Sequence, residues 1–159
     1  KKKKNDLQYL LRWQIFNVLA GNSDGHAKNL SLLYRANGEI QLAPFYDLVC
    51  TRAIERIDYH LAFSVGNERN PGIVSTKHWD DLAQQCGLRA RFLQGQVQDV
   101  AVSLLEHLPP TREKFETLYG KYPALQRIEK VVNKQCRRTI RNKCDWQGSQ
   151  RTTNYASAF

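Results

Sequence analysis

A short polar stretch of the chain contains the side-chain types that phosphoryl transfer to a hydroxyl requires. Asp24, His26, Lys28 and Asn29 lie close together, and a second carboxylate, Asp47, follows further along the chain. A carboxylate can orient or deprotonate the attacking hydroxyl, while carboxylate and amide oxygens are suitable ligands for the Mg²⁺ ions that bridge phosphates. These residues therefore indicate a candidate centre for this chemistry.

The elements on either side of this stretch must position its side chains. Residues 7–20 are apolar around nearly the whole circumference of a helix, which predicts a central, buried helix. Asn5 or Asp6 is the expected N-terminal cap, and Gly21 is expected to end the helix. The polar loop then begins directly after a rigid element.

A hairpin is expected between Asn29 and Asp47. Residues 30–34 and 39–42 read as two strands around Asn37-Gly38, a dipeptide that suits a type I′ turn. Because two antiparallel strands return the chain to its starting point, Asn29 and Asp47 should meet at one metal ion.

The spacing of Asp24 and Asn29 is that of protein kinases, in which the catalytic Asp and a metal-binding Asn form Asp-x-x-x-x-Asn. This pattern alone is also compatible with a helix cap and a turn residue, with Asp47 as a surface charge. His26 either shapes the loop as a neutral hydrogen-bonding group or assists the base. Lys28 either neutralises phosphate charge or remains paired with Asp24 or with solvent.

Two motifs together resemble the C-terminal lobe of HipA-type serine/threonine kinases, the toxin halves of toxin–antitoxin pairs. They are Asn22-Ser23-Asp24-Gly25-His26-Ala27-Lys28-Asn29 and Leu42-Ala43-Pro44-Phe45-Tyr46-Asp47-Leu48. The resemblance implies that Asp24 is the catalytic base and that Asn29 and Asp47 bind Mg²⁺. As further site candidates, we expect His26 and Lys28 to assist catalysis and Asn22 and Lys28 to contact the nucleotide.

This resemblance carries expectations about fold, cofactors and partners. The fold would be mainly α, a protein-kinase-like C-lobe with a catalytic loop and a small β-hairpin, over residues 5–143, with a flexible tail at 144–159. ATP and Mg²⁺ would be the cofactors. Partners would be a protein substrate, such as an aminoacyl-tRNA synthetase, and a helix-turn-helix antitoxin through which DNA is reached only indirectly.

The sequence departs from the family in one respect. No Gly-rich phosphate loop and no strand lysine precede the catalytic helix, and the chain opens on Lys1–Lys4 and contains no Met. We therefore expect this chain to be part of a longer polypeptide whose N-terminal kinase lobe is missing here. We also expect that this chain alone does not usefully bind ATP.

Two other functions remain compatible with the sequence. The Asp-x-His-x-x-Asn pattern also resembles the catalytic loop of phosphoinositide 3/4-kinases, which would phosphorylate a lipid or small molecule. The ending Pro44-Phe45-Tyr46-Asp47 favours the HipA type, because the lipid kinases have Asp-Phe-Gly there. A kinase-lobe fragment that only binds a partner is the non-enzymatic alternative.

The remainder of the chain reads as a loop followed by helices. Residues 48–75 are expected to form a loop over the site, with a short strand at 61–65. Helices are expected from Ser75 or Thr76 to Gln85, from about Arg89 to His107, from Thr111 onward, and from about Pro123 to Lys143. We expect the break between the second and third of these helices at Pro109-Pro110.

Composition narrows the class of partner. With 24 basic and 15 acidic residues the net charge is +9, which favours anionic partners. A row of cations repeats at three- and four-residue intervals near the C-terminus: Arg127, Lys130, Lys134, Arg138 and Arg141. This row is either a solvated helix face or an anion-binding face for RNA or the antitoxin's DNA, and we leave both possibilities open.

The four Cys fit neither a zinc site nor a disulfide framework, and no signal peptide or membrane span is visible, so a reduced cytoplasmic protein is expected.

Overall fold

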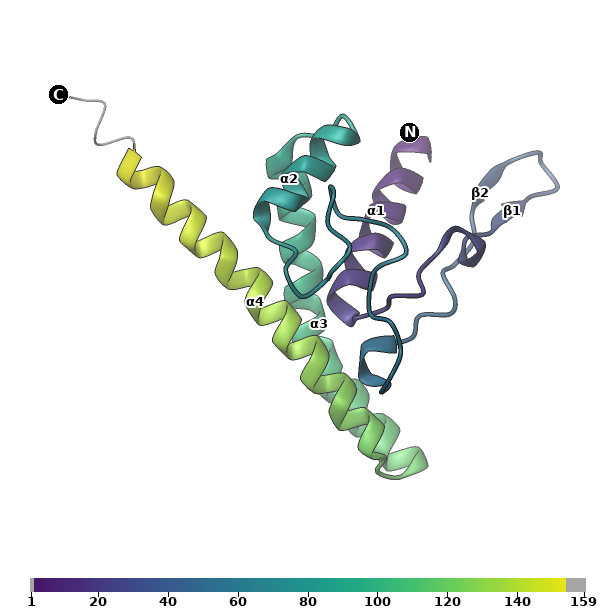
Figure 1. Ribbon diagram of the computed structural model, residues 1–159. Coiled ribbons are helices and arrows are strands. Elements are labelled where there is room, and N and C mark those ends of the chain that lie inside the picture. Colours follow the sequence, from purple (N-terminus) through teal and green to yellow (C-terminus); the bar gives the residue numbers. More distant parts are fainter. Residues whose placement is uncertain (1, 154–159) are drawn as a thin grey trace.

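Four α-helices and one small hairpin make up the structure, a computed structural model that describes residues 2–153 and the side chains of residues 6–141 (Figure 1). The elements in chain order are α1 (Lys2–Ala20), η1 (Ala27–Asn29), β1 (Leu32–Tyr34), β2 (Ile40–Leu42), η2 (Thr51–Ala53), α2 (Thr76–Gln85), α3 (Ala90–Tyr119) and α4 (Pro123–Thr153). The expected mainly α fold with one hairpin is confirmed.

The core lies where α3 packs against the other three helices. α1 contributes Leu11, Ile15 and Leu19 at helical spacing, and α3 and α4 contribute Leu93 and Val132. The C-terminal half of α1 is buried as expected, but Leu7 and Tyr9, nearer its N-terminus, are exposed. Over the described residues, no helix has both the length and the apolar character needed to cross a membrane.

The expected break at Pro109-Pro110 is wrong, because α3 runs through both prolines to Tyr119. Each proline removes one backbone hydrogen bond and crowds the preceding turn. Tertiary packing outweighs this cost: Leu108 packs against the core, and beyond the prolines Arg112 pairs with Glu129 of α4. α3 and α4 thus form a long helical hairpin (Figure 1).

Two smaller expectations also need correction. α4 does not end near Lys143 but continues to Thr153, while residues 154–159 of the expected tail lie outside the described residues. Residues 61–65 form no strand and contain only an isolated bridge at Val65, because Leu61 and Val65 are used as core side chains of an irregular loop.

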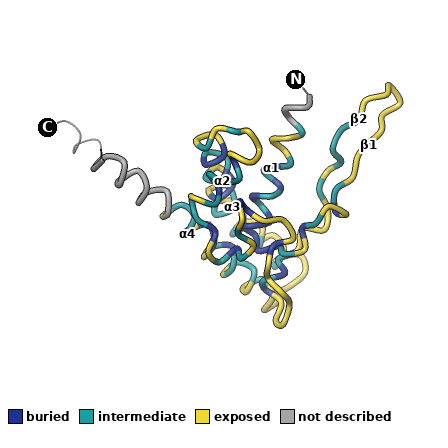
Figure 2. The backbone as a smooth tube through the Cα atoms, turned by 45° about the horizontal axis from the view of Figure 1, so that its top comes forward, coloured by how far each residue is buried: buried dark blue, intermediate teal, exposed yellow. Residues whose placement is uncertain are grey.

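The hairpin pairs Leu32 with Leu42 and Tyr34 with Ile40 in antiparallel register, but its turn is not type I′. Within this turn, only Gly38 has a positive φ, +78°, and its N–H donates to the carbonyl of Arg35 at 2.9 Å. A type I turn followed by a left-handed glycine matches the strand twist equally well with one more loop residue. The hairpin stands away from the helices, and much of its surface is exposed (Figure 2).

Candidate active site

Helix α1 and the short helix η2 together hold the start of the polar loop. Gly21, at φ +72°, ends α1 in the left-handed conformation that glycine adopts without strain. Its carbonyl accepts hydrogen bonds from the Thr51 hydroxyl at 3.0 Å and from the Arg52 N–H at 3.0 Å. The Ser23 N–H donates to Thr51 Oγ1 at 2.8 Å, so η2 fixes the loop on both sides of residue 22.

Two buried amide side chains support the loop from below. Asn22 Nδ2 donates to Asn17 Oδ1 at 3.0 Å and reaches the Asp47 carbonyl at 3.5 Å, while Asn22 Oδ1 accepts from the Asp24 N–H at 3.1 Å. The backbones of Asp24 and Asp47 are thereby connected through one side chain. Asn22 was expected to contact a nucleotide, but it is only 2% exposed and its polar atoms already have protein partners. Its placement indicates support of the loop instead.

Gly25 allows the loop to lie directly on this amide pair. A Cβ atom at this position would lie 2.4 Å from Asn17 Nδ2, which is far shorter than any real contact. Asn17 Nδ2 is itself buried and has no hydrogen-bond partner among the described residues. The glycine is required here for close approach rather than for an unusual φ.

The proposed base and its neighbours lie at the surface of the loop. The Asp24 side chain is 66% exposed, and its Oδ1 lies 3.5 Å from Nε2 of His26, which is 41% exposed. Lys28 is exposed, and within the described part of the chain no carboxylate pairs with it. Its carbonyl accepts from the Tyr46 hydroxyl at 3.1 Å, which ties the loop to the segment after the hairpin. Asp24 and His26 are therefore adjacent and open to a substrate.

Asn29 and Asp47 meet, as the hairpin led us to expect. The buried Asn29 donates from Nδ2 to the Asp24 carbonyl at 3.1 Å and to Asp47 Oδ2 at 3.2 Å. Asp47 is exposed and has a φ of +56°, a left-handed conformation that is uncommon for residues other than glycine. This backbone conformation occurs at the point where the chain turns its carboxylate towards Asn29.

The donor set fits Mg²⁺ rather than a metal caged by protein. Both Nδ2 hydrogens of Asn29 are directed to protein oxygens, which leaves Oδ1 as the atom able to bind a cation beside the Asp47 carboxylate. Among the described residues, no group of three or more His, Cys, Asp or Glu side chains could hold a metal. Mg²⁺ is commonly bound by one or two protein carboxylates or amides together with water and substrate phosphates.

The sequence reasoning missed three supporting residues: Asn17, Thr51 and Tyr46. Asn17 offered a signal, since it is a polar residue within the most buried stretch of α1, where an unpaired amide would be costly. Thr51 offered none, and Tyr46, although it stands in the second motif, gave no sign of its hydrogen bonds, because these bonds join segments that only the fold brings together.

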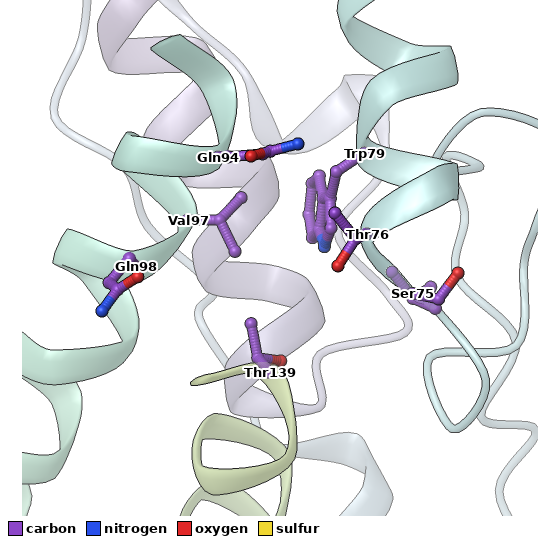
Figure 3. Close-up of a pocket in the computed structure, with 8 residues that line it drawn as sticks. Ser75, Thr76, Trp79, Gln94, Val97, Gln98 and Thr139 are labelled. Atoms are coloured by element: carbon purple, nitrogen blue, oxygen red, sulfur yellow. The ribbon is translucent and has the colours of Figure 1, made fainter. Parts of the chain in front are cut away.

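The cavities between the helices do not include the candidate catalytic residues. One lies among α2, α3 and α4 beside Trp79, Val97 and Thr139, and its volume of about 20 Å³ is suited to a water molecule (Figure 3). Another, of about 280 Å³, lies between α1 and α3 and is lined mainly by apolar and aromatic side chains. At the candidate site, Asp24 and Asp47 are exposed, whereas Asn29 between them is buried.

A helical lobe that carries a catalytic-type loop, a hairpin and a returning Asp is the C-terminal lobe of a protein-kinase-like fold. The family described as the HipA-like C-terminal domain matches residues 1–108, and this chain belongs to that family. The resemblance seen in the two sequence motifs is therefore confirmed.

Comparisons with individual proteins agree with this assignment. The chain is 36% identical over 134 residues to the serine/threonine-protein kinase toxin HipA of Shewanella oneidensis, covering 79% of this chain and 31% of that protein. It is 29% identical over 114 residues to the putative kinase Y4mE of Sinorhizobium fredii, covering 72% of this chain and 27% of that protein. The chain thus spans less than a third of these relatives.

A solved structure shows the same fold. It is the toxin–antitoxin complex of HipA and HipB with operator DNA from Shewanella oneidensis, which superimposes with a TM-score of 0.70 at 23% sequence identity. The match covers 82% of this chain and 31% of that one.

Proposed function

We propose that this chain is the catalytic lobe of a HipA-like toxin kinase that transfers the γ-phosphate of ATP to a Ser or Thr hydroxyl of a protein. The observation that carries the proposal is the position of Asn29, whose amide joins the backbone of Asp24 to the carboxylate of Asp47. The Asn29 side chain thereby sets the distance between the base, Asp24, and the metal ligand, Asp47. Phosphoryl transfer requires a base and a metal ligand held in a fixed arrangement.

Each loop side chain has a role in this proposal. Asp24 accepts the proton of the attacking hydroxyl, and its exposure leaves room for a protein substrate. His26 holds the Asp24 carboxylate in place, and Lys28 neutralises phosphate charge. Asn29 and Asp47 hold Mg²⁺, which neutralises charge on the transferring phosphate when it is bound.

The partners follow from the family and its fold. A nucleotide-binding lobe would complete the site, because this chain spans less than a third of its relatives and exposes apolar side chains such as Leu32, Tyr34 and Ile40 on the hairpin. A helix-turn-helix antitoxin is the proposed regulator, since the related HipA structure contains HipB. An aminoacyl-tRNA synthetase is the proposed target, and the cytoplasm the proposed location.

The test is the replacement Asp24→Asn in the full-length protein. We expect incorporation of labelled phosphate into protein to fall by about 10²–10⁴-fold, the usual contribution of a general base. The melting temperature should change little, because the side chain is largely exposed. Asp99→Asn, the same chemical change at an exposed position of α3, should alter neither quantity.

Two results would contradict the assignment. Retained activity in Asp24→Asn would move the proton-accepting role to His26. A large fall in melting temperature would show that Asp24 is a structural residue.

A further inference from the structure

The outer face of α4 carries a row of exposed cations, which we name the α4 basic row: Arg127, Lys130, Lys134, Arg137 and Arg141. At about 100° per residue these positions fall within an arc of about 80°. The buried Val132 and Cys136 lie on the opposite side of the helix. Arg138 was expected in the row, but it is half-buried and donates to the Pro71 carbonyl at 2.6 Å.

Carboxylates are sparse beside this row in the described part of the chain, where Glu55 lines the same cavity as Arg127 and Lys130. Between residues 123 and 141 the only acidic residue of α4 is Glu129, and it pairs with Arg112 of α3. Within the described part of the chain, no ion pair involves a member of the row. A solvated helix face usually mixes both signs of charge, so five cations without an ion-paired carboxylate among the described residues favour an anionic ligand.

At one end of the row, uncharged oxygen atoms accept hydrogen bonds from Arg127 and from its neighbour Arg52. Arg127 Nε donates to the Ala53 carbonyl at 3.1 Å, and the neighbouring Arg52 donates to Gln135 Oε1 at 3.4 Å. These contacts orient the guanidinium groups without cancelling their charge. Arg52, Arg127 and Lys130, together with Glu55, line a cavity of about 300 Å³ between η2 and α4. Burial, and then the charge of Arg52, lower the pKa of Arg138, as expected where cations gather.

The spacing of the row suits a regular line of negative charges. Arg127 and Arg141 are separated by about 21 Å along a helix with a rise of 1.5 Å per residue. One strand of a DNA duplex presents a phosphate about every 3.4 Å along its axis, so the row spans about six phosphates. α4 has no aromatic residue between 123 and 141, which disfavours the base stacking typical of single-stranded RNA.

We propose that the α4 basic row binds the phosphate backbone of duplex DNA directly, without reading the bases. This inference goes beyond the proposed function, in which DNA is reached only through the antitoxin. It also does not depend on kinase activity, because none of its residues belongs to the loop of Asp24.

The experiment measures binding of the complete chain to a fluorescently labelled 30-base-pair duplex of arbitrary sequence by anisotropy. Five phosphate contacts should give a slope of about −4 to −5 for log K against log salt concentration. In Lys130→Gln/Lys134→Gln the slope should become shallower by about 2, and the affinity near 0.1 M salt should fall at least about tenfold.

The matched control is Lys77→Gln/Lys114→Gln, which lowers the net charge equally at exposed positions outside the row. It should keep the slope of the original chain. Equal loss in both double variants would overturn the proposal, because binding would then follow net charge alone. Tighter binding to single-stranded poly-uridine RNA than to the duplex, or binding to poly-glutamate but not to DNA, would overturn it as well.

Discussion

Asn17 and Asn22 are a buried amide pair that connects α1 to both carboxylate-bearing segments of the site. An unpaired buried donor or acceptor costs about 1–3 kcal/mol, as for Asn17 Nδ2, so the bond from Asn22 Nδ2 to Asn17 Oδ1 matters because it satisfies the other polar atom of Asn17. Asn22 makes more contacts than Asn17, because its side chain forms hydrogen bonds with Asn17, Asp24 and Asp47 at once. Its contribution should therefore appear in both stability and activity.

We predict energetic coupling between Asn17 and Asn22. Asn17→Ala and Asn22→Ala should each lower the free energy of unfolding by about 1–3 kcal/mol, and the double variant should lose less than the sum by about 0.5–3 kcal/mol. Urea unfolding of the four proteins measures this double-mutant cycle. Strictly additive losses would show that the 3.0 Å contact between the two side chains contributes nothing.

At the scale of elements, α3 shows a helix held together by its packing. Pro109 and Pro110 leave the carbonyls of Leu105 and Glu106 without their usual N–H partners. Nearby side chains bond neighbouring carbonyls, since Thr111 Oγ1 donates to the His107 carbonyl at 2.6 Å. The two prolines therefore lower the local stability of α3, and the contacts between α3 and α4 offset this loss.

We predict that Pro109→Ala/Pro110→Ala stabilises the chain. Two restored backbone hydrogen bonds and relief of crowding should outweigh the greater freedom of the unfolded chain, for a gain of about 1–3 kcal/mol. Chemical denaturation gives the free energy of unfolding. Pro123→Ala is the control, because Pro123 occupies the first position of α4, where proline is favourable and its removal should bring no gain.

A destabilised or unchanged double variant would contradict this prediction. It would show that the prolines set a bend in α3 on which the contacts between α3 and α4 depend.

At the scale of the whole molecule, the chain has a complete helical core but an open site. The core joins side chains from all four helices, whereas Asp24 and Asp47 lie exposed at the edge of the lobe. Kinases enclose the nucleotide between two lobes, with a Gly-rich loop and a lysine from the other lobe on the phosphates. Folding and nucleotide binding are therefore expected to separate in this chain.

We predict that the isolated chain unfolds cooperatively but binds Mg-ATP no more tightly than the millimolar range. Two exposed metal ligands compete poorly with water for a nucleotide whose adenine has no enclosed pocket. Calorimetric titration of the chain measures the dissociation constant, and thermal unfolding serves as the control for folding. A dissociation constant in the low micromolar range would refute the prediction and imply a nucleotide site elsewhere in the lobe.

Local sequence features were sufficient for the family, the loop and much of the fold. The spacing of Asp24 and Asn29, the glycine after α1 and the strand pattern around Asn37-Gly38 all act over a few residues, so they could be read directly. The hairpin then brought Asn29 to Asp47 because antiparallel strands must return the chain.

Tertiary contacts decided what local signals could not. The continuity of α3 through two prolines depends on α4, and the Asn17–Asn22 support beneath Gly25 depends on how closely the loop approaches α1. A row of cations on α4 was visible as a pattern, with Arg138 in place of Arg137, but only the structure showed that none of its members forms an ion pair among the described residues. Each outcome depends on groups distant in sequence, whose packing energies exceed the local preferences of the chain.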